Sequence, residues 1–180
     1  MAKTASDAIA LLKADHRKVE DLFEKFEKAR DSGRKVALAK EICTELMIHS
    51  IIEEEIFYPA CKGVVEEDQM DEAYVEHDGA KVMIAELLGS SPEADFYDAK
   101  MKVLSEEIKH HVKEEEQPGE GVFAQARAGD LDMVGLGDRM AARKEELKTK
   151  FQSDGLPPPK TRAFTGHKLE QGKPVDAKTV

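Results

Sequence analysis

The sequence is poor in several residue types that would mark particular classes of protein. It contains no tryptophan, its aromatic residues make up 6% of the chain, and its cysteines are Cys43 and Cys61 alone. Two cysteines do not make the disulfide framework of a small secreted domain, so we expect reduced thiols. No apolar run approaches the ~20 residues of a membrane span, and residues 1–6 lack the apolar core of a secretory signal. We therefore expect a cytoplasmic protein without a membrane partner.

Positive charge is also in short supply. Lys and Arg number 27 against 37 Asp and Glu, which gives a formal net charge of −10 at pH 7. Phosphate backbones and anionic lipid headgroups repel a chain of this charge. We therefore expect no binding of nucleic acid and no non-specific binding to anionic membrane surfaces.

The chain does contain long amphipathic segments separated by strong breaks. Apolar residues recur at steps of three and four, which places them on one face of a helix. Glycine and proline interrupt this pattern, for example at Gly89-Ser90-Ser91-Pro92 and at Pro118-Gly119. The pattern predicts helices over about 6–30, 34–57, 70–88 and 93–117, a short helical turn over 121–127, and a helix over 130–151. We predict an all-α fold: an up-down-up-down antiparallel four-helix bundle with an additional C-terminal helix, residues 1–151 forming one domain.

The C-terminal segment, residues 152–180, differs in composition from the rest of the chain. It holds Pro157-Pro158-Pro159 and Pro174 and almost no apolar residues. Such a composition is typical of an extended or disordered chain, so we expect a Pro-rich tail that is extended or disordered. The tail is less acidic than the body, which leaves open whether it lies across the acidic bundle.

Histidine and glutamate occupy positions where a bundle core needs apolar side chains. His49 and Glu53 lie one turn apart on the apolar face of their helix, and His111 and Glu115 repeat the arrangement. His16 and His77 fill gaps in the apolar faces of the other two helices. A buried unpaired carboxylate is strongly unfavourable, and a metal ion would compensate it.

These side chains are expected to meet at one level of the bundle. At about 1.5 Å per residue, each histidine lies at a comparable height in an up-down arrangement. Imidazoles from the four helices with two bridging carboxylates suit two transition-metal ions, and iron, manganese and zinc are all compatible. Cysteine ligation is not indicated. His110 lies off the buried face, and His167 lies in the tail, so we expect neither to be a ligand.

The motifs resemble a known family. Asp15-His16, His49-xxx-Glu53-Glu54, Glu76-His77 and His111-xxx-Glu115-Glu116, in this order, are similar to those of hemerythrin-like HHE cation-binding domains. The resemblance covers about residues 5–151. It implies a site with two iron ions, non-haem and oxo- or hydroxo-bridged, held by His16, His49, Glu53, His77, His111 and Glu115.

Two positions depart from the pattern of oxygen-carrying hemerythrins. Lys81 stands where those proteins have a fifth histidine. Those proteins also place an aspartate five residues after the last ligand histidine, whereas this chain has Glu115 four residues after His111. We expect Lys81 to extend out of the bundle into solvent. An open or water-filled position, or an oxygen donor from Tyr58, Tyr74 or Asp78, then completes the site. Glu54 and Glu116 lie about 100° around their helices from the ligands, so we expect them in solvent or behind the ligands.

The sequence leaves three functions open. The first is a module that binds or senses dioxygen, nitric oxide or iron, with a small diatomic ligand or peroxide as its partner. The second is a di-iron redox enzyme, active in peroxide turnover or iron-centre repair. The third is a structural bundle that holds zinc or no metal. Any protein partner stays unidentified at this stage.

Overall fold

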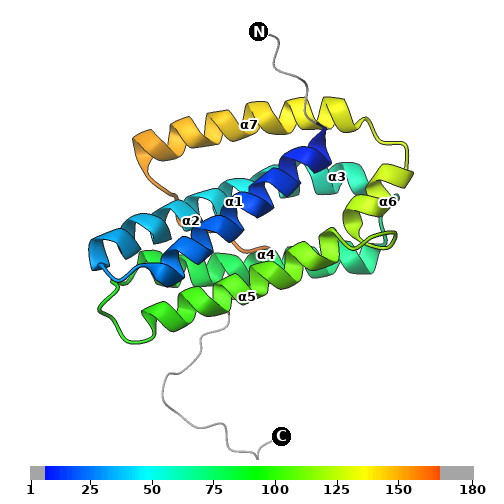
Figure 1. The fold of residues 1–180 in the computed structure, drawn as a ribbon. Coiled ribbons are helices and arrows are strands. Elements are labelled where there is room, and N and C mark those ends of the chain that lie inside the picture. The colour runs from blue at the N-terminus through cyan, green and yellow to red at the C-terminus, as the bar shows by residue number, and fades with distance from the viewer. Residues whose placement is uncertain (1–6, 167–180) are drawn as a thin grey trace, which may run out of the picture.

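The computed structural model describes residues 7–166, and the part of the tail beyond them, with His167, lies outside the described residues. The described chain is helical and contains no β-strand, so the all-α prediction is confirmed (Figure 1). None of these helices combines the length and the apolar character needed to cross a membrane.

Four long helices form the body of the molecule. Their bounds are Ala8–Lys28 for α1, Ser32–Ile52 for α2, Glu67–Leu88 for α4 and Tyr97–Glu115 for α5. Aspartate side chains begin the first two, because Asp7 accepts a hydrogen bond from the Ala10 amide and Asp31 from the Arg34 amide. Two further helices, Val122–Ala128 (α6) and Met133–Asp154 (α7), follow.

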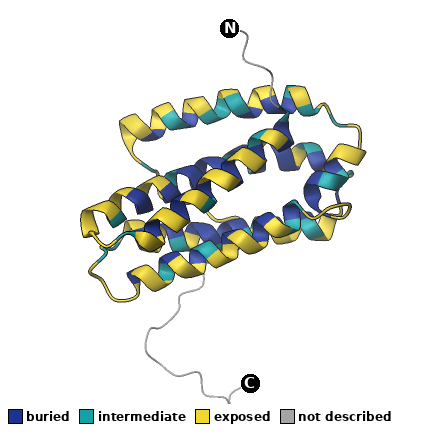
Figure 2. Cartoon of the chain, in the orientation of Figure 1, coloured by how far each residue is buried: buried dark blue, intermediate teal, exposed yellow. Residues whose placement is uncertain are grey.

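The long helices pack in a closed sequence of neighbours. α1 contacts α2, α2 contacts α4, α4 contacts α5, and α5 contacts α1. Their buried faces turn toward one another, while their outer faces are exposed (Figure 2). α7 lies across α1 and α2 on the outside of this arrangement. The core is therefore enclosed by helices that each contribute one apolar face.

A wider turn interrupts the second helix where the chain carries its acidic motif. Residues Glu53–Phe57 form a π-helical turn, and a short helix, α3, continues from Tyr58 to Cys61. The Tyr58 amide donates to the Glu53 carbonyl, five residues back. The predicted helix stopped at residue 57, but the chain stays helical through Pro59, which lies in the first turn of α3, where its missing N–H is tolerated. Such π-turns are frequent at functional sites because they redirect side chains.

Several helix ends differ from the prediction. α4 begins at Glu67 rather than Met70, and α5 begins at Tyr97 rather than Glu93 because Phe96 adopts a left-handed conformation with φ of 67°. α7 begins at Met133 and continues to Asp154, where Gly155 with φ of 80° ends it.

The described part of the tail, residues 155–166, returns to the body and contacts α4. The backbone amides of Arg162 and Ala163 both donate to Asp78 Oδ2, the first at 2.6 Å. The Arg162 guanidinium lies over the Tyr74 ring, with its carbon 4.4 Å from the ring centroid. This segment therefore lies against the acidic bundle, which the sequence left open.

Candidate metal centre

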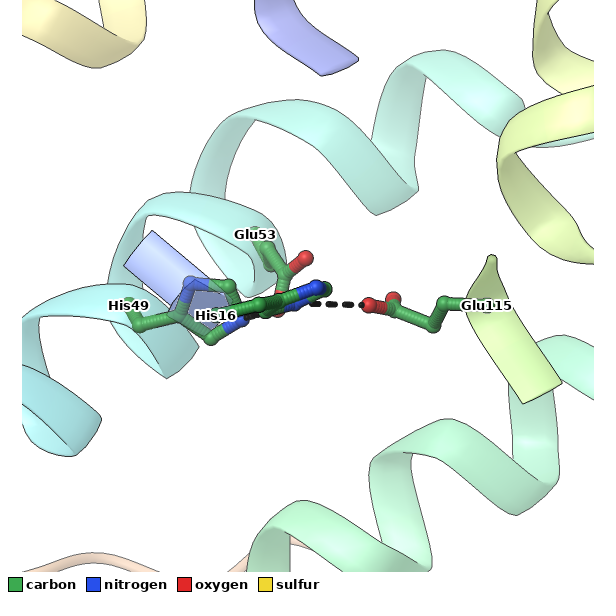
Figure 3. A group of neighbouring side chains, drawn as sticks. All are labelled: His16, His49, Glu53 and Glu115. Carbon is green, nitrogen blue, oxygen red and sulfur yellow. Dashed lines mark hydrogen bonds and ion pairs between the residues drawn. The ribbon is translucent and has the colours of Figure 1, made fainter. Parts of the chain in front are cut away.

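The six side chains singled out by the sequence converge inside the bundle. His16 comes from α1, His49 from α2, His77 from α4 and His111 from α5, while Glu53 begins the π-turn and Glu115 ends α5. Each is at most 5% exposed, and both glutamates are 0% exposed. Figure 3 shows His16, His49, Glu53 and Glu115 pointing toward one another.

The histidines form two pairs whose Nε2 atoms face each other. The distance is 3.3 Å between His16 and His49 and 3.2 Å between His77 and His111. A neutral imidazole that donates from Nδ1 carries a lone pair on Nε2. Two such lone pairs at this distance repel each other unless a proton or a metal ion lies between them.

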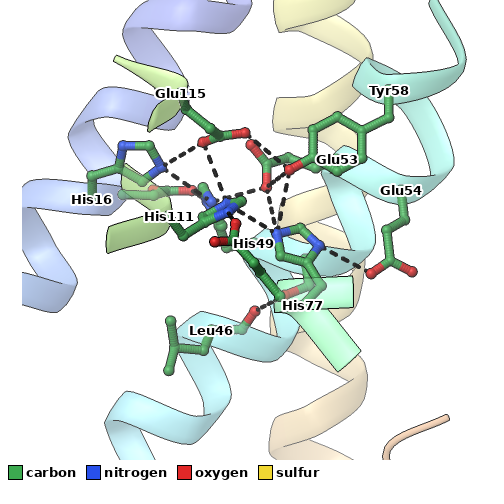
Figure 4. A network of polar contacts seen from close by, with 12 residues as sticks. His16, Leu46, His49, Glu53, Glu54, Tyr58, His77, His111 and Glu115 are labelled. Atoms are coloured by element: carbon green, nitrogen blue, oxygen red, sulfur yellow. Dashed lines mark hydrogen bonds and ion pairs between the residues drawn. The ribbon is translucent and has the colours of Figure 1, made fainter. Parts of the chain in front are cut away.

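Each glutamate connects the two histidine pairs. Glu53 Oε2 lies 3.0 Å from His49 Nε2 and 3.3 Å from His77 Nε2. Glu115 Oε2 lies 3.3 Å from His16 Nε2 and 3.5 Å from His111 Nε2 (Figure 4). Glu53 Oε1 and Glu115 Oε2 are buried and take part in no hydrogen bond within residues 7–166. Buried carboxylate oxygens without donors are a strong sign of a missing cation.

A ring of outer carboxylates holds the histidines from behind. The Nδ1 atom of His16 lies 2.8 Å from Glu116 Oε1, that of His77 lies 3.0 Å from Glu54 Oε1, and that of His111 lies 2.7 Å from Glu76 Oε2. Asp15 Oδ2 lies 3.8 Å from His49 Nδ1 and completes the ring more loosely. Each helix thus supplies the carboxylate behind the histidine of a neighbouring helix. This arrangement fixes the tautomer and leaves Nε2 directed into the centre.

These contacts also set the protonation of the centre. Burial alone would lower the pKa of His49, but the charge of Glu53 and the Asp15 carboxylate beside Nδ1 outweigh it and raise that pKa to about 10. Burial would also lower the pKa of His16 and of His77, but the neighbouring carboxylates outweigh burial and raise both pKa values. Burial would raise the pKa of Glu53, but the His49 charge holds it well below its usual range. Protons therefore neutralise the carboxylates when no metal ion does.

Of the three candidate oxygen donors, Tyr58, Tyr74 and Asp78, it is Tyr58 whose side chain reaches the centre. Its hydroxyl lies 2.9 Å from Glu115 Oε1 and 3.4 Å from both Glu53 Oε2 and His77 Nε2. In an α-helix, residues five apart lie about 140° around the axis from each other; the π-turn brings Tyr58 back onto the face of Glu53. Burial and the charges of Glu115 and Glu53 raise the Tyr58 pKa well above its usual range, so the phenol keeps its proton.

The two other candidate donors are engaged elsewhere. Asp78 accepts from the tail amides and lies 3.2 Å from the Lys81 ammonium, while Tyr74 contacts the Tyr58 ring and the Arg162 guanidinium. The expectation for Lys81 was wrong: it is 4% exposed and lies 2.6 Å from Glu54 Oε1. Two carboxylates on different helices balance its charge inside the protein, so it does not need to reach solvent.

Sequence reasoning missed the role of the outer ring. Asp15 and Glu76 were recognised as parts of the motifs but received no role, and Glu116 was expected either in solvent or behind the ligands. Its side chain is 18% exposed and contacts His16. The signal was present, because each of these acids is adjacent in sequence to a ligand candidate.

The donors fit a pair of metal ions. With bonds of about 2.0–2.2 Å, neighbouring ligand atoms around one ion lie roughly 3.0–3.5 Å apart, which matches the separations within the centre. Nitrogen and carboxylate donors without thiolates suit iron, manganese or zinc. The arrangement can therefore hold two cations bridged by carboxylates.

Comparisons with known proteins agree with this geometry. The sequence model of the hemerythrin HHE cation-binding domain matches residues 7–118. An uncharacterized protein of Mycobacterium tuberculosis, Rv2633c, is 28% identical over 143 residues, which cover 79% of this chain and 88% of that protein. A DNA nickase from Nostoc is 26% identical over 106 residues, which cover 59% of this chain but 30% of the nickase.

A solved structure has the same fold. The crystal structure of a hemerythrin HHE cation-binding domain-containing protein from Mycobacterium kansasii, a homologue of Rv2633c, superposes with a TM-score of 0.69. It is 24% identical in sequence, and the match covers 84% of this chain and 95% of that one. The motifs, the fold and the family match agree, and the chain therefore belongs to the hemerythrin HHE cation-binding domain family.

Proposed function

We propose that this protein binds two iron ions between its helices and uses them to bind or sense dioxygen, nitric oxide or iron. The ligands are His16, His49, Glu53, His77, His111 and Glu115, with Glu53 and Glu115 shared between the ions. We also propose that α1, α2, α4 and α5 form the up-down-up-down antiparallel bundle of the sequence prediction. The short connections from α1 to α2 and from α4 to α5, together with the closed sequence of contacts, support that topology.

One observation carries the proposal: the His16–His49 and His77–His111 Nε2 atoms face each other at 3.3 and 3.2 Å. Carboxylates behind three of these rings accept from Nδ1 and direct Nε2 into the centre, where a metal ion or a proton must lie between the facing nitrogens. Two such pairs, connected by two carboxylates, support two ions rather than one.

The donor set suits iron as well as manganese and zinc, and the resemblance to proteins with two iron ions leads us to propose iron. Imidazole and carboxylate together suit iron and manganese, and buried thiolates are not among the donors. Bound iron would supply redox chemistry and an exchangeable coordination position. The protein's part is to orient the imidazoles through the outer carboxylates and to exclude bulk water from the buried centre.

Tyr58 takes the place of the absent fifth histidine in this proposal. Its hydroxyl lies within 3.4 Å of groups from both halves of the centre, and the other candidate oxygens are occupied. As a phenol it donates a hydrogen bond to Glu115, and as a phenolate it would serve as an oxygen ligand.

The same hydroxyl favours a second function, turnover of peroxide by a di-iron redox enzyme. Reduction of hydrogen peroxide to two waters takes two electrons, which bound ferrous iron would supply, and two protons. Tyr58 holds one proton in the buried centre, 2.9 Å from Glu115. Catalytic turnover against stoichiometric binding separates the two functions.

The test is metal analysis of the purified protein together with absorption spectra recorded without and with air. Two irons per chain and a spectrum that changes on exposure to air or nitric oxide would support the proposal. A colourless protein that holds zinc, or no metal after iron supplementation, would refute it. Repeated consumption of hydrogen peroxide per di-iron centre would favour the enzyme, and a single equivalent would favour binding or sensing.

A further inference from the structure

A second group of metal-ligating side chains lies at the surface beside the buried centre. His110 and Glu114 are one turn apart on α5, and Glu76 faces them from α4. His110 Nε2 lies 3.1 Å from Glu114 Oε1 and 3.4 Å from Glu76 Oε1. The three groups offer ligand atoms that all lie within 4.8 Å of one another. The two separations from His110 match those of neighbouring ligands around one ion with bonds of about 2.0–2.2 Å.

A cavity of about 110 Å³ is lined by Glu76 and Glu114 of this surface group and by His111 and Glu115 of the buried centre. Glu72, Glu76 and Glu114 line it from the outer side, and His111 and Glu115 line it from within. One water needs about 10–15 Å³ of such space, so the cavity has room for several. Glu115 is fully buried, and its Oε2 atom takes part in no hydrogen bond within the described chain. The cavity therefore reaches a buried carboxylate of the centre, whose Oε2 atom lies 3.3 Å from His16 Nε2 and 3.5 Å from His111 Nε2.

Glu76 joins the outer group to the inner one. Its Oε1 atom faces His110 Nε2 at 3.4 Å, and its Oε2 atom lies 2.7 Å from His111 Nδ1. The Glu76 carboxylate would thus lie between an ion held by His110 and the imidazole of His111, which is one of the proposed inner ligands. Among the described residues, no lysine or arginine lines this cavity, so its carboxylates attract cations.

We propose that His110, Glu76 and Glu114 form a loading site that captures a divalent first-row metal ion and passes it through the cavity to the buried centre. The site offers three protein ligands and leaves the remaining positions to water, as exchangeable metal sites do. The His110 side chain is 58% exposed, so a captured ion keeps contact with solvent and is released readily. This proposal rests on the proposed function, because the transferred ion is the one that the buried centre holds.

The kinetic test follows the uptake of Fe²⁺ by metal-free protein in the absence of oxygen. Samples are quenched with excess chelator at set times, and the iron that the protein retains is measured. We expect His110→Ala and Glu114→Gln to load about tenfold more slowly than wild type at limiting Fe²⁺. Both should still reach the wild-type iron content and melting temperature. Glu106→Gln is the matched control, because it removes one exposed carboxylate from α5 outside the cavity and should load at the wild-type rate.

A binding test addresses the site directly. Iron-loaded wild type, titrated with Zn²⁺ by calorimetry, should show one weak site that His110→Ala lacks and Glu106→Gln retains. Equal loading rates in all four proteins, or identical Zn²⁺ titrations of wild type and His110→Ala, would overturn the loading site. Wild type that never retains two irons would instead overturn the proposed function, so the two failures are distinguishable.

Discussion

Glu116 allows the outer ring to be tested without removing a ligand. Its Oε1 atom lies 2.8 Å from His16 Nδ1, and its side chain also contacts Arg17 at 2.8 Å and Lys13 at 3.4 Å. A hydrogen bond from His16 lowers the Glu116 pKa, so the group is a carboxylate at neutral pH. Glu116→Gln preserves the shape and one acceptor oxygen but removes the negative charge behind the ring.

The expected effect follows from the position of that charge. Loss of a carboxylate behind a metal-bound histidine weakens metal binding by about 10–100-fold, or about 1.4–2.7 kcal/mol. Glutamine keeps a hydrogen bond, so we place Glu116→Gln near the lower limit and Glu116→Ala near the upper one. The lost pairs with Arg17 and Lys13 should change folding stability by less than about 1 kcal/mol, because those side chains are 57% and 46% exposed.

The assay is competition with a metal chelator of known affinity, with metals per chain measured at saturation. Glu20→Gln is the matched control: Glu20 contacts the same Arg17 at 3.1 Å but does not contact the imidazole of His16. We predict weaker binding for Glu116→Gln, wild-type binding for Glu20→Gln, and two metals per chain in both at saturation. Equal affinity in the two variants would refute the positioning role. An empty centre in Glu116→Gln beside a loaded Glu115→Gln would show that the buried face must be redrawn by one residue.

Other substitutions and conditions separate folding from metal binding. Glu53→Ala should lose at least one metal per chain, and calorimetry at neutral pH should show the metal-free variant melting below metal-free wild type, because protonated His49 loses the carboxylate that neutralises it; an unchanged or higher melting temperature would contradict this. Glu115→Ala should also lose at least one metal per chain. A chelator should lower the melting temperature of loaded wild type, and an unchanged value after verified metal removal would contradict a buried site. Tyr58→Phe should abolish any phenolate-to-iron absorption band in the visible spectrum, and a band that persists would exclude Tyr58 as its source. The raised pKa of His49, about 10 against 6.5, stabilises the metal-free fold below pH 6.5, and this stability is lost as the pH rises through 10. Because a metal ion competes with the proton for the same nitrogen, metal affinity measured by chelator competition should rise with pH. A metal affinity that does not change with pH would contradict this competition.

Helical periodicity predicted which side chains meet because a residue's direction in an α-helix follows from its position. His16, His49, His77 and His111 stood where the apolar face required a buried group, and the structure places them together. Periodicity alone did not identify their distance or their order, which depend on how the helices pack.

The failures of sequence reasoning have local physical causes. The π-turn at Glu53–Phe57 changes the angle between successive residues, so an α-helical wheel misplaces Tyr58. The burial of Lys81 depends on Glu54 and Asp78, which a lysine in isolation does not reveal. The contact of Arg162 and Ala163 with Asp78 uses backbone amides, which have no signature in sequence.

The central claim is that two metal ions lie between these helices. Anomalous diffraction at the iron absorption edge, from crystals of protein loaded with iron, tests it most directly. We predict two peaks per chain, one among His16, His49 and the two bridging glutamates, and one beside His77 and His111. A single peak, or none in protein shown to contain iron, would contradict the claim.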